Sequence, residues 1–144
     1  MFLRISGGAA RAMLPVFLAA LLLSACAAKD DADGAQDGMT ISVSLRDVHR
    51  CSRISPEIQI SGIPAGTTHF DVRLVEYGDQ ENFFGGGSWP NDGTSTIPEG
   101  GLTRHYRGPC PPAGQSRNYA FVVSAMGGRD IQPLAVRLYR FTQE

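Results

Sequence analysis

A run of glycine and proline in the second half of the chain is the stretch best suited to binding chemistry. It reads Gly108-Pro109-Cys110-Pro111-Pro112. Each proline fixes its own φ angle and lacks an N–H, whereas glycine lets another backbone approach closely. Such a stiff loop can hold backbone N–H groups around an anion with little loss of entropy on binding.

Side chains with the spacing that catalysis needs are missing from the sequence. The histidines are His49, His69 and His105, and no serine lies in a Gly-x-Ser-x-Gly nucleophile motif. The Gly85–Gly87 run lacks the Gly-Lys-Ser/Thr ending of a phosphate loop, and no cysteine–histidine spacing suits a metal. We therefore expect a protein that is not an enzyme and holds no metal or cofactor, with His69 and His105 as surface or hydrogen-bonding residues.

Cys26 ends a segment that predicts export. Arg4 and Arg11 precede an apolar run, Ala12–Leu23, which is shorter than the roughly 20 residues that span a bilayer and is typical of a signal peptide. The sequence Leu23-Ser24-Ala25-Cys26 resembles a lipobox, the signal at which bacterial lipoproteins are cleaved before a cysteine. That resemblance implies a signal peptide over residues 1–25 and diacylglycerol on the Cys26 thiol.

The same resemblance predicts a location. The cysteine thiol would carry diacylglycerol, and the new amino terminus would carry a further acyl chain. Several acyl chains hold a protein on a membrane, whereas one chain alone does not. Ala27 follows the cysteine, whereas an Asp there would have resembled an inner-membrane retention signal. We expect a lipoprotein of the bacterial cell envelope, bound to the outer membrane through its N-terminal lipid and facing the periplasm.

Cys51 and Cys110 remain as an isolated pair. In an oxidising periplasm such a pair tends to form a disulfide. A bridge that closes about 60 residues is worth on the order of 4 kcal/mol in the chain-entropy model, a large contribution for a small domain. Two buried free thiols are the alternative.

The composition divides the mature chain into a lipidated cysteine with a tether, residues 26–38, and one domain, residues 39–144. Residues 27–38 contain no large apolar side chain and should be disordered. The chain has 13 basic and 14 acidic residues, of which ten of each fall in the domain. A net charge near zero gives no indication of nucleic-acid binding.

Hydrophobic residues in the domain recur mostly with period two, which is typical of half-buried strands. The alternating stretches are Ile41–Leu45, Ile58–Ile60, Phe70–Leu74 and Leu134–Leu138, and in the last the apolar positions are Leu134, Val136 and Leu138. Tyr119–Ala125 is almost continuously apolar, as in a strand buried on both faces. Glycine-rich punctuation between them, including Gly85–Gly93, predicts turns. An antiparallel β-sandwich is the natural architecture.

Three motifs, in this order, resemble those of the phosphatidylethanolamine-binding protein (PEBP) family, which includes the bacterial Raf-kinase-inhibitor-like proteins. They are Ser55-Pro56-Glu57-Ile58 with Ile63–Phe70, then Ile97-Pro98-Glu99-Gly100, then Tyr106–Gly114 followed by Arg117-Asn118-Tyr119-Ala120-Phe121. The resemblance covers residues 51–126. It implies an all-β sandwich in which residues 108–112 wall a surface pocket for phosphate, acetate or a phospholipid headgroup.

The resemblance also implies ligand contacts, with departures from the family pattern. The implied ligand residues are Asp79, Tyr106, Gly108, Pro109, Pro111, Pro112, Arg117 and Tyr119. Arg117 stands where the family has histidine, and the first aspartate of the family motif falls on Tyr77 or, with a gap, on Glu76. The family's His-Trp pair has no histidine here, and its C-terminal helical region is absent.

Two functions follow as hypotheses. The first is a non-catalytic, lipid-anchored periplasmic binding protein for a small anionic or phospholipid-headgroup-like ligand. The second is a protein-interaction module on the same scaffold, with a degenerate ligand pocket. In that alternative, the loop carrying Phe83, Phe84 and Trp89 would be the apolar anchor for an unknown periplasmic protein.

Overall fold

The computed structural model describes residues 38–78, 81–129 and 132–144, which belong to one compact unit. The signal peptide, Cys26, all but the last residue of the tether, and Asp79 lie outside the described residues. Within those three ranges the only helical element is a 3-10 helix, η1 (Asp47–His49), and no helix there is long and apolar enough to cross a membrane.

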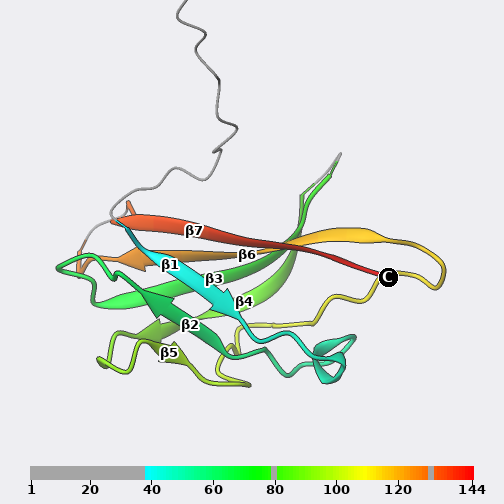
Figure 1. Cartoon of the computed structure of the whole chain (residues 1–144), viewed down its shortest axis with the longest axis horizontal. Helices are drawn as coiled ribbons and strands as arrows, with labels where there is room; N and C mark the ends of the chain where they lie inside the picture. The colour runs from blue at the N-terminus through cyan, green and yellow to red at the C-terminus, as the bar shows by residue number, and fades with distance from the viewer. Residues whose placement is uncertain (1–37, 79–80, 130–131) are drawn as a thin grey trace, which may run out of the picture. The chain divides into compact units, whose positions relative to one another are not determined.

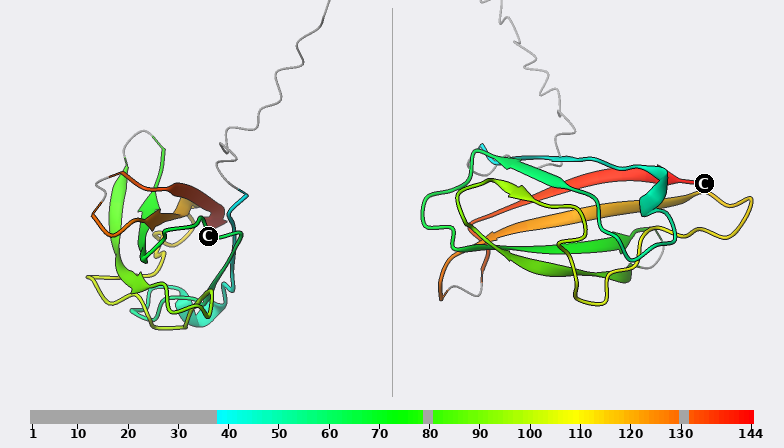
Figure 2. Two further views of the ribbon diagram at one scale, coloured as in Figure 1. Left: turned by 90° about the vertical axis from the view of Figure 1, so that its left-hand side faces the viewer. Right: turned by 90° about the horizontal axis from the view of Figure 1, so that it is seen from below.

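In the described part of the chain, seven strands form two antiparallel sheets (Figure 1). The first has the order β1-β2-β5 and the second β4-β3-β6-β7. Their bounds are β1 (Thr40–Val43), β2 (Ile58–Ser61), β3 (His69–Glu76), β4 (Asn82–Pro90), β5 (Thr96–Ile97), β6 (Arg117–Met126) and β7 (Ala135–Gln143). Seen end-on, the sheets lie across the interior from each other (Figure 2). The predicted antiparallel sandwich is confirmed, and β7 is the last element in the described residues.

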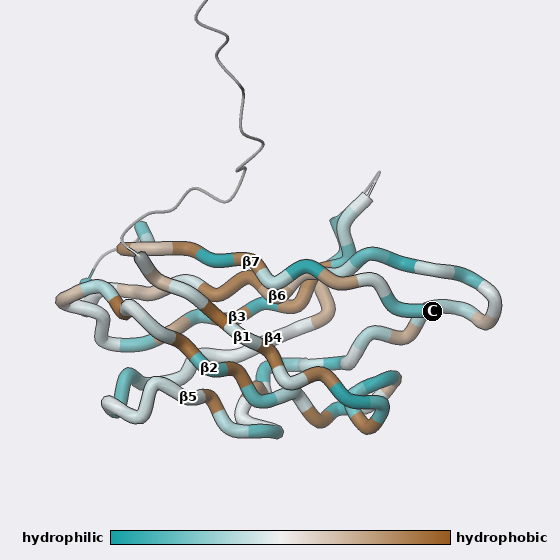
Figure 3. The backbone as a smooth tube through the Cα atoms, in the orientation of Figure 1, coloured by the Kyte–Doolittle hydropathy of each residue, from teal (hydrophilic) through white to brown (hydrophobic). Residues whose placement is uncertain are grey.

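The hydrophobic core of the domain follows from the alternation of apolar and polar residues along its strands. Side chains alternate between the faces of a strand, so Ile58 and Ile60 of β2 meet Phe70, Val72 and Leu74 of β3 in the interior. Figure 3 shows the resulting alternation of hydrophobic and hydrophilic residues along the tube. The strands predicted from alternation are therefore present.

Strand β6 is buried on both faces, as its continuous apolar sequence predicts. Tyr119 and Phe121 lie in the interior core, whereas Ala120 and Val122 pack with Val75 on the outer face of the sheet. Because β6 is paired with β3 on one side and β7 on the other, both of its edges are also covered.

The buried face of β7 differs from the prediction. Tyr139 and Phe141 pack against the interior core together with the fully buried Ala135, whereas Leu138 is 37 % exposed on the other face. The aromatic side chains remove more apolar area from water than the leucine would, and this decides which face turns inward.

The glycine-rich segment predicted as a turn is mostly strand β4. A side chain at Gly86 would place its Cβ 1.8 Å from the carbonyl oxygen of Val72, and one at Gly87 would lie 3.2 Å from Leu102 Cα. The glycines therefore allow neighbouring backbones to approach closely. In the sequence alone, glycines that serve this purpose inside a strand look the same as glycines in a turn.

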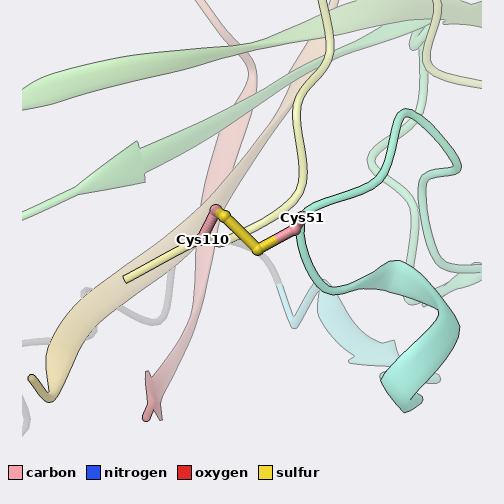
Figure 4. The surroundings of a disulfide bond; sticks show 2 residues. All are labelled: Cys51 and Cys110. Atoms are coloured by element: carbon pink, nitrogen blue, oxygen red, sulfur yellow. A yellow bond between two sulfur atoms is a disulfide. The ribbon is translucent and has the colours of Figure 1, made fainter. Parts of the chain in front are cut away.

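The predicted disulfide joins Cys51 to Cys110, with an S–S distance of 2.03 Å (Figure 4). The alternative of two free thiols is thereby set aside. Two backbone hydrogen bonds accompany the bridge, from Cys51 N–H to Pro109 O at 3.0 Å and from Gly108 N–H to Ser52 O at 2.7 Å. The glycine-proline run is thus fastened to the segment that follows η1.

Candidate ligand-binding site

An ion pair lies at one end of the four-stranded sheet, on the face that is turned toward the core. Glu76 is the last residue of β3 and Arg117 the first of β6, and Glu76 pairs with Tyr119 in the antiparallel register. Arg117 Nη1 donates to Glu76 Oε1 at 3.0 Å, and its Nη2 donates to Gln115 Oε1 at 2.7 Å. The arginine predicted to face an anion is therefore already engaged by a carboxylate.

These two residues line a pocket of about 580 Å³, which we call the Arg117 pocket. Its lining residues are Glu76, Tyr77, Gly78, Asn82, Ser116, Arg117 and Asn118. The Arg117 side chain is 44 % exposed and the Glu76 side chain 15 % exposed. A guanidinium, a carboxylate, amides and a hydroxyl give the pocket donors, acceptors and both signs of charge.

Glu76 and Tyr77 were both candidates for the position of the family's first aspartate. Both line the Arg117 pocket, but Glu76 is the one that bonds Arg117. Glu76 has the same strand parity as Leu74 and so shares the inner face, whereas Tyr77 follows the end of β3. The acid at this site is therefore Glu76.

Tyr119, a predicted ligand residue, belongs to the core and does not line the Arg117 pocket. It is 1 % exposed, and its ring meets Phe84 edge-on at 5.7 Å and stacks on Phe141 at 5.6 Å. Burial, and then the negative charge of Glu76, raise the pKa of Tyr119, while a hydrogen bond from the Cys110 backbone opposes the shift. Tyr119 thus contacts the disulfide-bearing loop from within the core.

The glycine-proline run, Gly108–Pro112, was predicted to contact the ligand, but none of its residues lines the Arg117 pocket. The run has little room for change. A Cβ at Gly108 would lie 1.9 Å from His49 O. Pro109 and Pro111 are buried, whereas Pro112 is exposed and its carbonyl accepts a hydrogen bond from Gln115 N–H at 2.9 Å. The Gly108 N–H, a predicted anion donor, is bonded to Ser52 in this structure.

Tyr106 is not part of the Arg117 pocket. It is 3 % exposed and stacks on Phe121 with ring centroids 6.4 Å apart. Its hydroxyl is buried with no hydrogen-bond partner among the described residues, and burial raises its pKa strongly. Tyr106 instead lines a cavity of about 250 Å³ with Arg53 and His105, among others.

His49 has a role that the sequence did not reveal. It is fully buried at the end of η1, where Nδ1 accepts the Arg46 N–H at 3.0 Å and Nε2 lies 3.0 Å from Glu99 Oε2. Glu99 also pairs with Arg46. Burial and then the Arg46 charge lower the pKa of His49. The polar segment around it carries no sequence signal for a buried histidine.

The aromatic anchor of the interaction-module hypothesis is divided between two faces. Phe83 is 59 % exposed, whereas Phe84 and Trp89 pack against the interior core. These residues belong to β4 and not to a loop, and strand alternation separates Phe83 from Phe84. They do not form one continuous apolar surface.

No protein-family model and no curated protein matches the chain. Among solved structures it is similar to YbcL of E. coli, described as a new member of the mammalian PEBP family, with a TM-score of 0.58 at 16 % identity over 74 % of this chain and 98 % of that chain.

The chain has a PEBP-like fold. At 16 % identity the likeness concerns the fold alone. The architecture that the three motifs implied is confirmed, and the PEBP-like sandwich places Arg117 and Glu76 at one end of its larger sheet, beside the loop that carries the disulfide.

Proposed function

We propose that this protein is a non-catalytic, lipid-anchored binding protein of the bacterial envelope, and that its ligand is a phosphate-bearing headgroup with a cationic amine, such as phosphoethanolamine. The single observation that carries the proposal is the pairing of Arg117 with Glu76 in one open pocket of about 580 Å³. The lipid anchor rests on the lipobox-like sequence that ends at Cys26.

The charges argue for a zwitterion over a simple anion. A phosphate alone would gain the Arg117 guanidinium but would approach the Glu76 carboxylate, which repels it. A ligand that carries both charges can place its phosphate on Arg117, with two parallel hydrogen bonds, and its ammonium on Glu76. Asn82 and Ser116 supply neutral partners around the pair.

The PEBP-like fold supports the proposal through the family's name, since phosphatidylethanolamine carries such a headgroup. The arginine at position 117 keeps a donor where the family has histidine and makes its charge independent of pH near neutrality. We propose that the headgroup enters the Arg117 pocket and lies beside Tyr77, Asn82 and Asn118.

Calorimetric titration of the protein with glycerophosphoethanolamine, inorganic phosphate and acetate tests the proposal. Glycerophosphoethanolamine should bind most tightly, and Arg117→Ala should weaken it by at least roughly tenfold, which corresponds to about 1.4 kcal/mol. Arg73→Ala, on an exposed position of β3, is the matched control and should leave binding unchanged. Absence of binding by all three compounds at millimolar concentration would overturn the proposal.

A further inference from the structure

A second hydrophobic cluster lies outside the core, on the outer face of the four-stranded sheet. Its members are Val75, Ala120 and Val122, with Val136 packed against them. Two large apolar side chains on the same face stay exposed, Phe83 at 59 % and Leu138 at 37 %. A buried apolar cluster that continues into exposed apolar side chains on the outside of a sheet indicates a contact surface.

The strand registers join these residues into one diagonal row. Leu138 of β7 is the register partner of Val122 of β6. On β6, Ala120 shares the face of Val122 and is the register partner of Val75 of β3. Val75 is in turn the partner of Phe83 of β4, so the row crosses all four strands, which lie side by side in Figure 1. We call this row the apolar band, consisting of Phe83, Val75, Ala120, Val122, Leu138 and Val136.

The direction of the apolar band makes it complementary to itself. With strands about 4.8 Å apart and a rise of about 3.4 Å per residue, the band runs at roughly 45° to the strands. A two-fold axis along the band would lay the band of one copy on that of another, with the strands of the two sheets crossing at near right angles. Near-perpendicular crossing is one of the two ways in which sheets pack face to face, and contact of one patch with itself is typical of a homodimer.

Charges of opposite sign flank the apolar band. Asp71, on the outer face of β3, lies on one side, and Arg140, on the outer face of β7, lies on the other. Two strand spacings and four residues separate them, which is roughly 17 Å within one chain. The two-fold axis along the band brings Asp71 of each copy opposite Arg140 of the other. Arg73 lies on the same side as Asp71, where its long side chain can keep its charge in water.

We propose that two copies of this chain associate through the apolar band, with the outer faces of their four-stranded sheets packed at near right angles and Asp71 of each copy paired with Arg140 of the other. A second copy fits better than a different protein, because the flanking charges complement themselves under the same symmetry that lays the band on itself. The association does not depend on the ligand of the Arg117 pocket.

Cysteine crosslinking of the full-length chain in a bacterial host tests the association. Facing sheets lie about 10 Å apart, which is too far for a direct disulfide, so a short bismaleimide is the reagent. Leu138→Cys places a thiol on the apolar band and should give a crosslinked dimer. Val48→Cys, at a position of η1 that is 48 % exposed, is the matched control and should give only the background of the chain without an added cysteine.

Charge exchange tests the symmetry of the dimer. In the Leu138→Cys chain, Asp71→Arg should lower the crosslinked fraction at least roughly fivefold, because two arginines would then face each other. Arg140→Asp should lower it in the same way, since two aspartates would then meet. The two substitutions together exchange the charges and should restore the fraction to within about twofold of the parent, which also shows that the variants fold.

Three outcomes would overturn the proposal. One is equal crosslinking at positions 48 and 138, which would reflect random encounter on the membrane. Another is a double exchange as weak as the single reversals, which would mean that Asp71 and Arg140 do not meet. The last is a crosslinked product whose mass is not that of two copies, which would assign the apolar band to a different protein.

Discussion

Arg117 Nη1 and Glu76 Oε1 lie 3.0 Å apart across the adjacent strands β6 and β3. The guanidinium that a ligand phosphate would use is therefore shared with a carboxylate of the same pocket. Under the proposed function, this pairing favours a zwitterionic ligand over a simple anion, and it gives a test that tells the two apart.

Glu76→Gln should change the binding of two ligands in opposite directions. Inorganic phosphate should bind on the order of fivefold more tightly, since the repelling carboxylate is gone, and glycerophosphoethanolamine should bind on the order of fivefold more weakly, since its ammonium loses a partner. Calorimetric titration measures both. Weakening of both ligands would mean that Glu76 only positions Arg117.

Loss of the disulfide should destabilise the domain without unfolding its sheets. Cys51 and Cys110 are 59 residues apart in sequence, and a cross-link over that span contributes on the order of 4 kcal/mol by restricting the unfolded chain. Urea unfolding of Cys51→Ser with Cys110→Ser should show this loss, and thiol labelling of the wild type, purified without reductant, should find no free thiol at either position. Two reactive thiols would contradict the assignment.

Gly108→Ala should be strongly destabilising, although it adds one methyl group. The new Cβ would lie 1.9 Å from His49 O, so the backbone must move and the Gly108–Ser52 hydrogen bond must break. We expect a loss of at least about 2 kcal/mol by urea unfolding. Gly78→Ala, where no atom lies within 4 Å of the added Cβ, is the control and should be nearly neutral.

His49 should make the domain less stable in mild acid. Its pKa is lowered below the ordinary value of 6.5, first by burial and then by Arg46. The unfolded chain therefore binds the proton more readily than the folded one, so the free energy of unfolding falls as pH drops below about 6.5, and the contribution is complete above it.

Urea midpoints measured above and below that pH check the effect of His49. His49→Gln should flatten the pH dependence, whereas His105→Gln, at an exposed position, should leave it unchanged. A pH dependence that persists unaltered in His49→Gln would assign it to other groups.

The proposed lipid anchor depends on the thiol of Cys26. The wild-type chain should incorporate labelled palmitate in a bacterial host and partition into detergent, because the sequence before Cys26 resembles a lipobox. Cys26→Ser should do neither. Palmitate incorporation that survives this substitution would place the lipid elsewhere.

The strands and the sandwich were available from the sequence because they depend on local periodicity. Phe70, Val72 and Leu74 alternate with polar residues, and alternation in a strand fixes which side chains share a face. The disulfide was predictable for a different reason, since Cys51 and Cys110 were an isolated pair in a chain predicted to be exported.

Other features depended on packing between segments distant in sequence. Gly86 looked like a turn residue because its partner, the Val72 carbonyl, belongs to another strand. Which face of β7 is buried was set by the packing of Tyr139 and Phe141 against the core beside β6. The alternation of residues along β7 by itself does not choose between its two faces.

Charge placement was likewise decided by the tertiary structure. Composition showed ten basic and ten acidic residues in the domain and no net charge. The fold pairs Arg117 with Glu76, and it brings Arg53 and Arg107 to one cavity although 54 positions separate them in the sequence. The sum of charges is a property of the sequence, whereas electrostatic interaction depends on distance, and only the folded chain sets those distances.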